Sequence, residues 1–444
     1  MTDNLITGSF IYDAVIIGAG ASGLFCAASA GVDAKGANAY ANFPADAKGA
    51  AIHKAPGSFR GLILEKTAHA GTKLLMSGSG QCNITHGGSI KDFISCYGDK
   101  GKKIRICLYK HSNLSMMNFL KNNGIDVFER EDGKVFPSSM NAADVLDMLL
   151  EEAGKNRFEI KYNSPVTGIV RANEPKPELP SASSGLQNDA PLWSVICGDV
   201  SYPARNVVIA TGGCSYPSTG SDGSMFKVLS RDLDIEITKL KPALSSVQVN
   251  DYPYAELSGI SFDKIGVSIW RSGRKTAEAC EDLLFTHRDL SGPAVINISK
   301  YADPGDRLKI NYLCPVTYRQ VLDRLKAVMH GAGGNPANII SSEFSLPKRF
   351  CQLITRKSGS SLKALAANLT GEEFIISSVS GFNRAMATAG GIDLRQINTA
   401  TFAFKEHPGL YAIGEALDVD GITGGYNLQF AYSSAVSAMT AICV

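Results

Sequence analysis

The chain has 444 residues, of which 44% are hydrophobic and 19% are charged, and its formal net charge is +2 at pH 7. This length corresponds to about three structural units of roughly 150 residues, so the chain can bury a sizeable core. Because neither sign of charge is in excess, we expect no nucleic-acid partner and no electrostatic binding to an anionic membrane.

The ten cysteines are scattered, with no C-x-x-C pair and no histidine partners at zinc-finger spacing. This distribution predicts neither a bound metal nor a dithiol redox motif. Without a disulfide framework or a leader pattern in the first ten residues, we expect the protein to be cytoplasmic. The uncharged stretch 14–32 contains four glycines and is too weakly apolar to predict a membrane helix.

The first predicted element is Tyr12–Ile17, a short β-branched run typical of a buried parallel strand. A G-x-G-x-x-G motif follows, and then an alanine-rich helix over 24–30. In such a motif Gly18 makes the tight turn, Gly20 lets the backbone approach a pyrophosphate, and Gly23 allows helix and strand to pack closely. This setting predicts a dinucleotide at the helix N-terminus, and a plain turn is the alternative.

An acidic residue that can hold the ribose hydroxyls of adenosine is expected at the end of the second strand. Glu65 closes the apolar run 61–64, but it lies further from the glycine motif than the usual ~20 residues. We interpret 32–60 as an inserted surface loop, which accounts for the extra length. By spacing alone, Glu65 could equally be a solvated carboxylate.

The rest of the chain contains two kinds of segment: buried strands that end at glycine turns, as at the start of the chain, and a middle region of short strands and helices. Predicted strands, helices and connecting segments are a helix over 140–153 capped by Asn141, strands over 158–170 and 192–197 separated by a Pro-rich segment over 174–191, a buried strand over 206–211, short strands between 243 and 310, helices over 318–329 and 362–368, a strand and turn over 409–414, and an apolar helix over 427–442. Because the last segments return to the style of the first, the domain that opens the chain must be discontinuous.

Several side chains could take part in chemistry. The loop 71–85 is rich in backbone and hydroxyl donors that suit a pyrophosphate or a ring edge. Cys82 in this loop could be a redox thiol or merely a small residue. His287 precedes a Ser-Gly-Pro turn and is our candidate proton-transfer residue, although it could simply position the loop. Tyr216 and Tyr426 are further possible proton donors.

These stretches, together with the blocks 135–137, 210–217, 284–293 and 414–429, resemble the bacterial aminoacetone-oxidase-type family of FAD-binding flavoproteins, which includes reductases of dehydro bile acids. The resemblance implies an α/β fold with a Rossmann-like, two-dinucleotide-binding-type FAD domain interrupted by a small β-barrel and a helical subdomain. The implied domains are 1–242 with 385–444 for FAD, 243–317 with 370–384 for the barrel, and 318–369 for the helices.

The resemblance also implies which residues bind the cofactor. The pyrophosphate would face the glycines with Ala21 and Ser22, and Glu65, Lys66 and Val166 would lie at the adenosine end. The remaining implied FAD contacts are Lys73, Ser77, Gly78, Cys82, Asn83, Ala210, Thr211, Gly212, Gly213, Gly414, Glu415, Asp418, Gly425, Tyr426, Asn427 and Leu428. The helix that begins near Gly425 would stabilise negative charge on a reduced flavin.

We therefore expect an FAD-dependent oxidoreductase that transfers hydride through its flavin. NAD(P)H-driven reduction of an activated C=C bond in a small organic molecule is the preferred reaction, and oxidation of a small amine or carbonyl compound is the alternative. A flavin-binding sensor or interaction protein without turnover is an alternative of another class. The sequence predicts no oligomeric state.

Overall fold

The computed structural model describes residues 6–7, 10–30, 59–172, 192–330 and 334–443. The chain divides into two compact units, of which unit 1 comprises 1–240 with 388–444 and unit 2 comprises 241–387. Residues 32–58 of the inserted loop predicted over 32–60, and the whole separator predicted over 174–191, lie outside the described residues. Among the described helices, none is long and apolar enough to cross a membrane.

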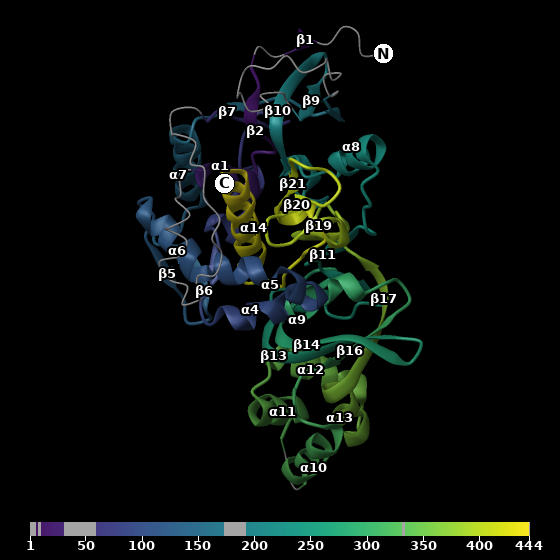
Figure 1. The fold of residues 1–444 in the computed structure, drawn as a ribbon. Coiled ribbons are helices and arrows are strands. Elements are labelled where there is room, and N and C mark those ends of the chain that lie inside the picture. The colour runs from purple at the N-terminus through teal and green to yellow at the C-terminus, as the bar shows by residue number, and fades with distance from the viewer. Residues whose placement is uncertain (1–5, 8–9, 31–58, 173–191, 331–333, 444) are drawn as a thin grey trace, which may run out of the picture. The chain divides into compact units, whose positions relative to one another are not determined.

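Unit 1 is built on a sheet with the central order β19-β20-β21-β10-β2-β3-β7 (Figure 1). Its main strands are β2 (Tyr12–Ile17), β3 (Gly61–Leu64), β7 (Phe158–Lys161), β8 (Gly168–Arg171), β9 (Trp193–Cys197), β10 (Val200–Ile209), β19 (Ile397–Asn398), β20 (Ala403–Phe404) and β21 (Leu410–Ala412). Five neighbouring strands pair in parallel, in the order β7, β3, β2, β10 and β21. Ala14 to Ile16 are fully buried, as the β-branched run predicted.

The helices of unit 1 pack against strands or against one another. They include α1 (Ala21–Ala28), α3 (Thr72–Leu75), α4 (Ile90–Cys96), α5 (Gly101–Lys110), α6 (Asn113–Asn122), α7 (Ala142–Lys155), α8 (Ser224–Leu233) and α14 (Tyr426–Cys443). Helix α14, yellow in Figure 1, packs against α1 and α5. Asn141 caps α7 through a bond that its side chain accepts from the Ala143 amide, which confirms the predicted cap.

Unit 2 contains a closed barrel with the order β12-β15-β14-β13-β16-β17. The strands are β12 (Val247–Val249), β13 (Ser261–Arg271), β14 (Arg274–Phe285), β15 (Leu290–Ser291), β16 (Arg307–Asn311) and β17 (Glu372–Val379). A helical subdomain of α10 (Tyr318–Met329), α11 (Pro336–Phe344), α12 (Lys348–Ser358) and α13 (Leu362–Gly371) is inserted between β16 and β17. These observations confirm the predicted Rossmann-type domain with an inserted barrel and helical subdomain.

Three expectations on individual elements were wrong. The predicted strand 158–170 is two strands, β7 and β8, separated by 162–167. The pieces predicted between 243 and 310 include β13 and β14, of 11 and 12 residues, which pair with register shifts that let long strands curve. Strand β10 begins at Val200 rather than at 206.

Candidate functional site

The glycine motif lies between β2 and α1 with the geometry that its spacing predicts. Gly18 has a φ of +104°, and a Cβ there would lie 2.6 Å from the Ala210 carbonyl oxygen. A Cβ on Gly23 would lie 2.0 Å from the Gly18 carbonyl oxygen. Both positions therefore require glycine so that strand, turn and helix can approach one another.

Gly20 differs from these two glycines because a Cβ there would meet no atom within 4 Å. It is the residue before α1, whose first turn includes Ala21 and Ser22. The free amides of a helix N-terminus attract phosphate, and open space over Gly20 leaves room for one. This part of unit 1 fits the pyrophosphate of FAD.

Glu65 closes β3 beside the glycine motif. Its Oε2 accepts a 2.8 Å bond from the Ala19 amide, and its Oε1 accepts bonds from the Thr67 amide and hydroxyl. The carboxylate is therefore fixed at the strand end where a ribose-binding acid is expected. Lys66 instead forms a 2.6 Å ion pair with Asp222, and Val166 is half-buried in the segment before β8.

A second glycine-rich turn follows the end of β10. Ala210 and Thr211 lead into Gly212, where a Cβ would lie 2.8 Å from the Ser221 hydroxyl oxygen. Ser221 is buried, and its Oγ has no hydrogen-bond partner within the part of the chain that the structure describes. An unsatisfied buried hydroxyl beside a glycine turn fits a polar group of a bound cofactor.

The segment 77–83 forms a tight turn with unusual backbone conformations. Gly78, Ser79 and Cys82 all have φ between 56° and 61°. Ser77 donates to the Leu74 carbonyl, and its own carbonyl accepts from the Cys82 amide. Successive backbone amides in a turn of this kind can form a concave site for an anion or a polar ring edge.

Cys82 itself is only 1% exposed, and burial raises the pKa of its thiol to about 11. The thiol is therefore protonated at neutral pH, which favours its interpretation as a small residue in a crowded turn.

Asn83 connects this turn to the start of α14. In the amide orientation that satisfies both groups, its side chain donates to the Thr85 carbonyl and accepts from the Gly425 amide, each at 3.1 Å. A Cβ on Gly425 would lie 2.5 Å from the Thr85 oxygen. Tyr426 stacks on His86 with the ring centroids 5.4 Å apart. These contacts hold the first turn of α14 against β4 (Thr85–His86).

The first turn of α14 also includes Asn427 and Leu428. The Asn427 side chain accepts from the Gly421 amide and donates to its carbonyl, while Leu428 is half-buried. The Tyr97 hydroxyl donates a 2.8 Å bond to the Tyr426 carbonyl. The loop that leads into α14 is thus fixed from both sides.

Lys73, Ser215, Glu415 and Thr388 form one polar network from four segments. The Lys73 ammonium donates to Glu415 Oε2 and to Ser215 Oγ, both at 2.6 Å. Glu415 Oε1 accepts from Ser215 Oγ at 2.7 Å and from the Thr388 amide at 2.9 Å. Thr388 also accepts from the Cys214 and Ser215 amides. The sequence did not single out Thr388, because no local motif surrounds it.

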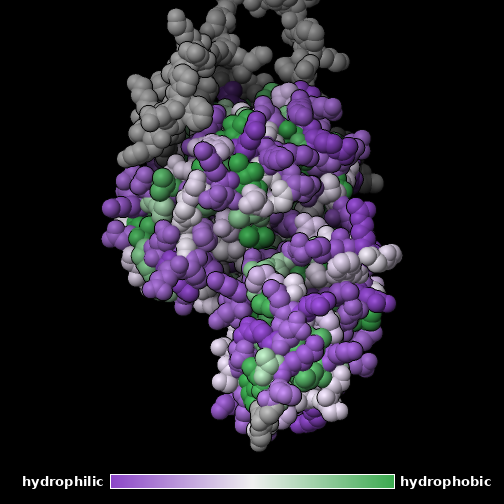
Figure 2. Space-filling model, turned by 90° about the horizontal axis from the view of Figure 1, so that it is seen from below, coloured by the Kyte–Doolittle hydropathy of each residue, from purple (hydrophilic) through white to green (hydrophobic). Residues whose placement is uncertain are grey.

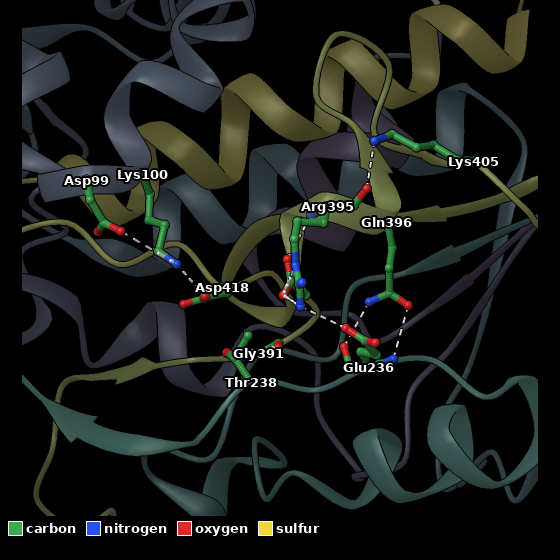
Figure 3. Close-up of polar contacts among 10 residues, drawn as sticks. Asp99, Lys100, Glu236, Thr238, Gly391, Arg395, Gln396, Lys405 and Asp418 are labelled. Atoms are coloured by element: carbon green, nitrogen blue, oxygen red, sulfur yellow. Dashed lines mark hydrogen bonds and ion pairs between the residues drawn. The ribbon is translucent and has the colours of Figure 1, made fainter.

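Asp418 lies in a second charged contact, shown in Figure 3. The Lys100 ammonium is 2.5 Å from Asp418 Oδ2 and 3.9 Å from Asp99. Partial burial lowers the pKa of Lys100, but the Asp418 carboxylate outweighs this effect and raises it. Nearby, Arg395 pairs with Asp393 and Glu236. Asp418 is therefore held by a protein cation at the start of α5.

Gly414 is a further glycine that lies close to the glycine motif, beside Ser22. Its amide donates to the Ser434 hydroxyl, and a Cβ there would lie 2.7 Å from Ser22 Cβ. A Cβ on Gly213 would lie 2.4 Å from the Thr388 hydroxyl oxygen. All the residues expected to bind FAD belong to unit 1.

His287 belongs to unit 2, in the exposed turn between β14 and β15. The proton-transfer role stays a prediction. Among the described residues, no group of three or more His, Cys, Asp or Glu side chains could hold a metal ion.

Comparison with known proteins finds relatives that align with this chain over nearly their whole length. The chain is 28% identical over 453 residues to the ribosomal RNA dihydrouridine synthase of Escherichia coli strain K12, covering 96% of each chain. It is 26% identical over 455 residues to the 3-dehydro-bile acid delta(4,6)-reductase of Clostridium scindens, covering 94% of this chain and 96% of the relative.

The fold is also similar to a solved structure, the 3-ketosteroid delta1-dehydrogenase of Sterolibacterium denitrificans. The two share 11% identity, with a TM-score of 0.48 and coverage of 98% of this chain and 99% of that one. The family model described as HI0933-like protein Rossmann domain matches residues 47–441. The predicted FAD flavoprotein and its oxidoreductase class are confirmed at this level, and the chain belongs to the HI0933-like family of Rossmann-domain flavoproteins.

Proposed function

We propose that this protein reduces a carbon–carbon double bond conjugated with a carbonyl group, and that a uracil ring of ribosomal RNA is its first candidate substrate. The observation that carries the proposal is a shared reaction among relatives with unlike substrates. A dihydrouridine synthase and a delta(4,6)-reductase, aligned over 96% and 94% of this chain, both saturate such a bond according to their names.

The chemistry of the two substrate classes is the same at the reacting atoms. In uracil the C5=C6 bond is conjugated with the C4 carbonyl, and in a 3-dehydro steroid the double bonds are conjugated with the 3-ketone. For the double bond next to the carbonyl, hydride adds to the β-carbon and a proton to the α-carbon; for the outer double bond of a dienone, hydride adds to the δ-carbon. In each case one reduced nicotinamide and one proton balance the saturation of one double bond. FAD, when bound, supplies the hydride-transfer chemistry.

The residues of unit 1 would contribute binding and electrostatics. The space over Gly20 and the fixed carboxylate of Glu65 suit the adenosine diphosphate half of the cofactor. The first turn of α14 would direct its amides at the pyrimidine edge of the flavin and stabilise negative charge there. The hydrogen bonds of Lys73 and Glu415 would hold α3 and the segment before α14 together at the cofactor.

Uracil comes first because the dihydrouridine synthases of Escherichia coli and Haemophilus influenzae are each 28% identical to this chain, against 26% for the steroid-type relative. This proposal departs from our expectation that the protein has no nucleic-acid partner, which rested on net charge alone.

An anaerobic titration of the purified protein with NADPH and with NADH tests the donor. We expect the yellow flavin to bleach with one equivalent of either nucleotide. A flavin that does not bleach with nicotinamides, but does with small amines, would favour the oxidase alternative and contradict the proposal.

A further inference from the structure

The outer face of α5 has a charge pattern that the cofactor site does not use. The 26 residues 100–125 contain six lysines and arginines and no aspartate or glutamate, in a chain whose net charge is only +2. Four of these cations, Lys102, Lys103, Arg105 and Lys110, lie on α5 and are exposed. The net charge of the chain therefore hides a local excess of positive charge.

The four cations share one face of the helix. Ile104, Cys107 and Leu108 are fully buried on the opposite side, where α5 packs against α4 and α14. Because an α-helix turns by about 100° per residue, the cations spread over the exposed arc. Ile106 and Tyr109 lie between them and are 44% and 38% exposed. We call these six exposed residues the α5 basic face.

Nothing in the described part of the chain neutralises this face, since none of its four cations has an ion pair there. By contrast, Lys155, Lys275, Arg307 and Lys326 on other elements each pair with a carboxylate. The α5 cations are therefore available to an external anion.

The arrangement is also unfavourable for the helix itself. Lys102 and Lys103 stand in the first turn, which contains no acidic residue, so both repel the positive end of the helix dipole. Lys102 and Arg105 are three residues apart on the same side and repel each other. Stability of α5 does not explain this choice of residues, whereas binding of a polyanion does.

We propose that the α5 basic face binds the phosphodiester backbone of RNA, with the Tyr109 ring available to stack on a base. This inference rests on the proposed function, in which the reduced uracil belongs to ribosomal RNA. Both ends of α5 are joined to segments that we expect to bind FAD, so RNA bound to the α5 basic face would lie near the cofactor site. Lys100, just before the helix, pairs with Asp418. The His111 carbonyl, just after the helix, accepts from Gln429 and Ser433 of α14.

RNA explains the face better than a lipid surface does. A helix that binds a membrane inserts its apolar side, but the apolar side of α5 is buried inside unit 1. On the face of the molecule drawn in Figure 2, hydrophobic residues form small groups among hydrophilic ones.

The test compares the wild type with a variant carrying Lys102→Gln, Lys103→Gln, Arg105→Gln and Lys110→Gln. A matched control carries Lys155→Gln, Lys275→Gln, Arg307→Gln and Lys326→Gln, which removes the same charge from cations that are already paired. Binding of a labelled single-stranded oligouridylate and of protein-free bacterial ribosomal RNA is followed by fluorescence anisotropy at several KCl concentrations.

We expect the α5 variant to bind both RNAs at least about tenfold more weakly, and the slope of log affinity against log salt to fall by up to about 3. The control should bind almost as the wild type does. Removing repulsion within α5 should not harm folding. The double variant Lys102→Gln with Lys103→Gln removes two of the four charges, so its slope should fall by about half as much as that of the fourfold variant, which provides a second measurement.

Equal binding by the wild type and the α5 variant, or binding of the wild type to vesicles of anionic phospholipid but not to RNA, would overturn the inference. Reduction of cyclohexenone by the flavin separates this result from failure of the proposed function. Loss of RNA binding with unchanged cyclohexenone reduction supports the α5 basic face. RNA binding through α5 without reduction of any conjugated double bond would refute the reaction but not the surface.

Discussion

The ammonium of Lys73 lies 2.6 Å from the Oε2 atom of Glu415, although the two residues are 342 positions apart in the chain. Their side chains are 26% and 21% exposed, so the pair is partly protected from solvent. Together with Ser215, this contact joins α3, which follows β3, to the segment that precedes α14.

Replacing Lys73 with methionine should leave Glu415 and Ser215 without their cation. We expect the free energy of unfolding to fall by about 1–2 kcal/mol and FAD to dissociate more readily, since a partly buried carboxylate loses its partner. Urea denaturation and flavin release by dialysis measure the two effects. The double variant Lys73→Met with Glu415→Gln should recover part of the stability, and additive losses would show that the pair is not coupled.

Gly20 and Gly23 provide a matched pair for the cofactor site. A Cβ at Gly20 would meet no atom within 4 Å, while a Cβ at Gly23 would lie 2.0 Å from the Gly18 oxygen. Gly20→Val should therefore fold, with a change of about 1 kcal/mol or less, but lose FAD because valine fills the space for the pyrophosphate. Gly23→Val should lose about 3 kcal/mol of stability as well as FAD. A normally flavinated Gly20→Val protein would refute the assignment.

His111, which ends α5, gives the protein a stability that depends on pH. Burial, and next the charge of Lys110, lower the pKa of His111 from 6.5 to about 4. The unfolded chain therefore binds a proton at a higher pH than the folded one, so stability is lost as pH falls from about 6.5 to about 4. We expect His111 to account for a loss of about 2 kcal/mol at pH 5.

Urea unfolding at pH 7 and pH 5 checks this effect. The His111→Leu variant should lose less stability between the two pH values than the wild type does. An equal loss in both proteins would show that His111 does not titrate abnormally.

The thiol of Cys82 should be unreactive. Because burial raises its pKa to about 11, alkylation by iodoacetamide at pH 8 should be much slower at Cys82 than at the exposed Cys280. Peptide mapping by mass spectrometry measures both rates. Cys82→Ser should retain FAD and turnover, and loss of turnover in this variant would restore the redox interpretation of the thiol.

The elements that the sequence predicts best are those with a local signal. Tyr12–Ile17 is β2 without any change of bounds, because its apolar run ends at a glycine that only a tight turn explains. The Asn141 cap of α7 was equally local. In contrast, β13 contains one glycine, Gly266, and both β13 and β14 contain charged and polar residues within long strands, and only closure of the barrel shows why they continue.

The site divides in the same way. The glycines follow from their spacing and Glu65 from its place at the end of a strand, and the structure places the motif and Glu65 side by side. Thr388 joins Ser215 through contacts between distant segments, which no periodicity or motif records. The α5 basic face was missed because charge was summed over the whole chain, although the absence of acidic residues from 100–125 can be read directly.

The most direct test of the proposed reaction starts from the reduced protein. The flavin is photoreduced without oxygen and mixed with protein-free ribosomal RNA that lacks dihydrouridine, and in parallel with a steroid enone. We predict that the yellow absorbance returns and that one double bond is saturated for each flavin reoxidised, with mass spectrometry showing two added hydrogens on the substrate. A flavin that stays reduced with every conjugated substrate, and is reoxidised only by oxygen, would contradict the account.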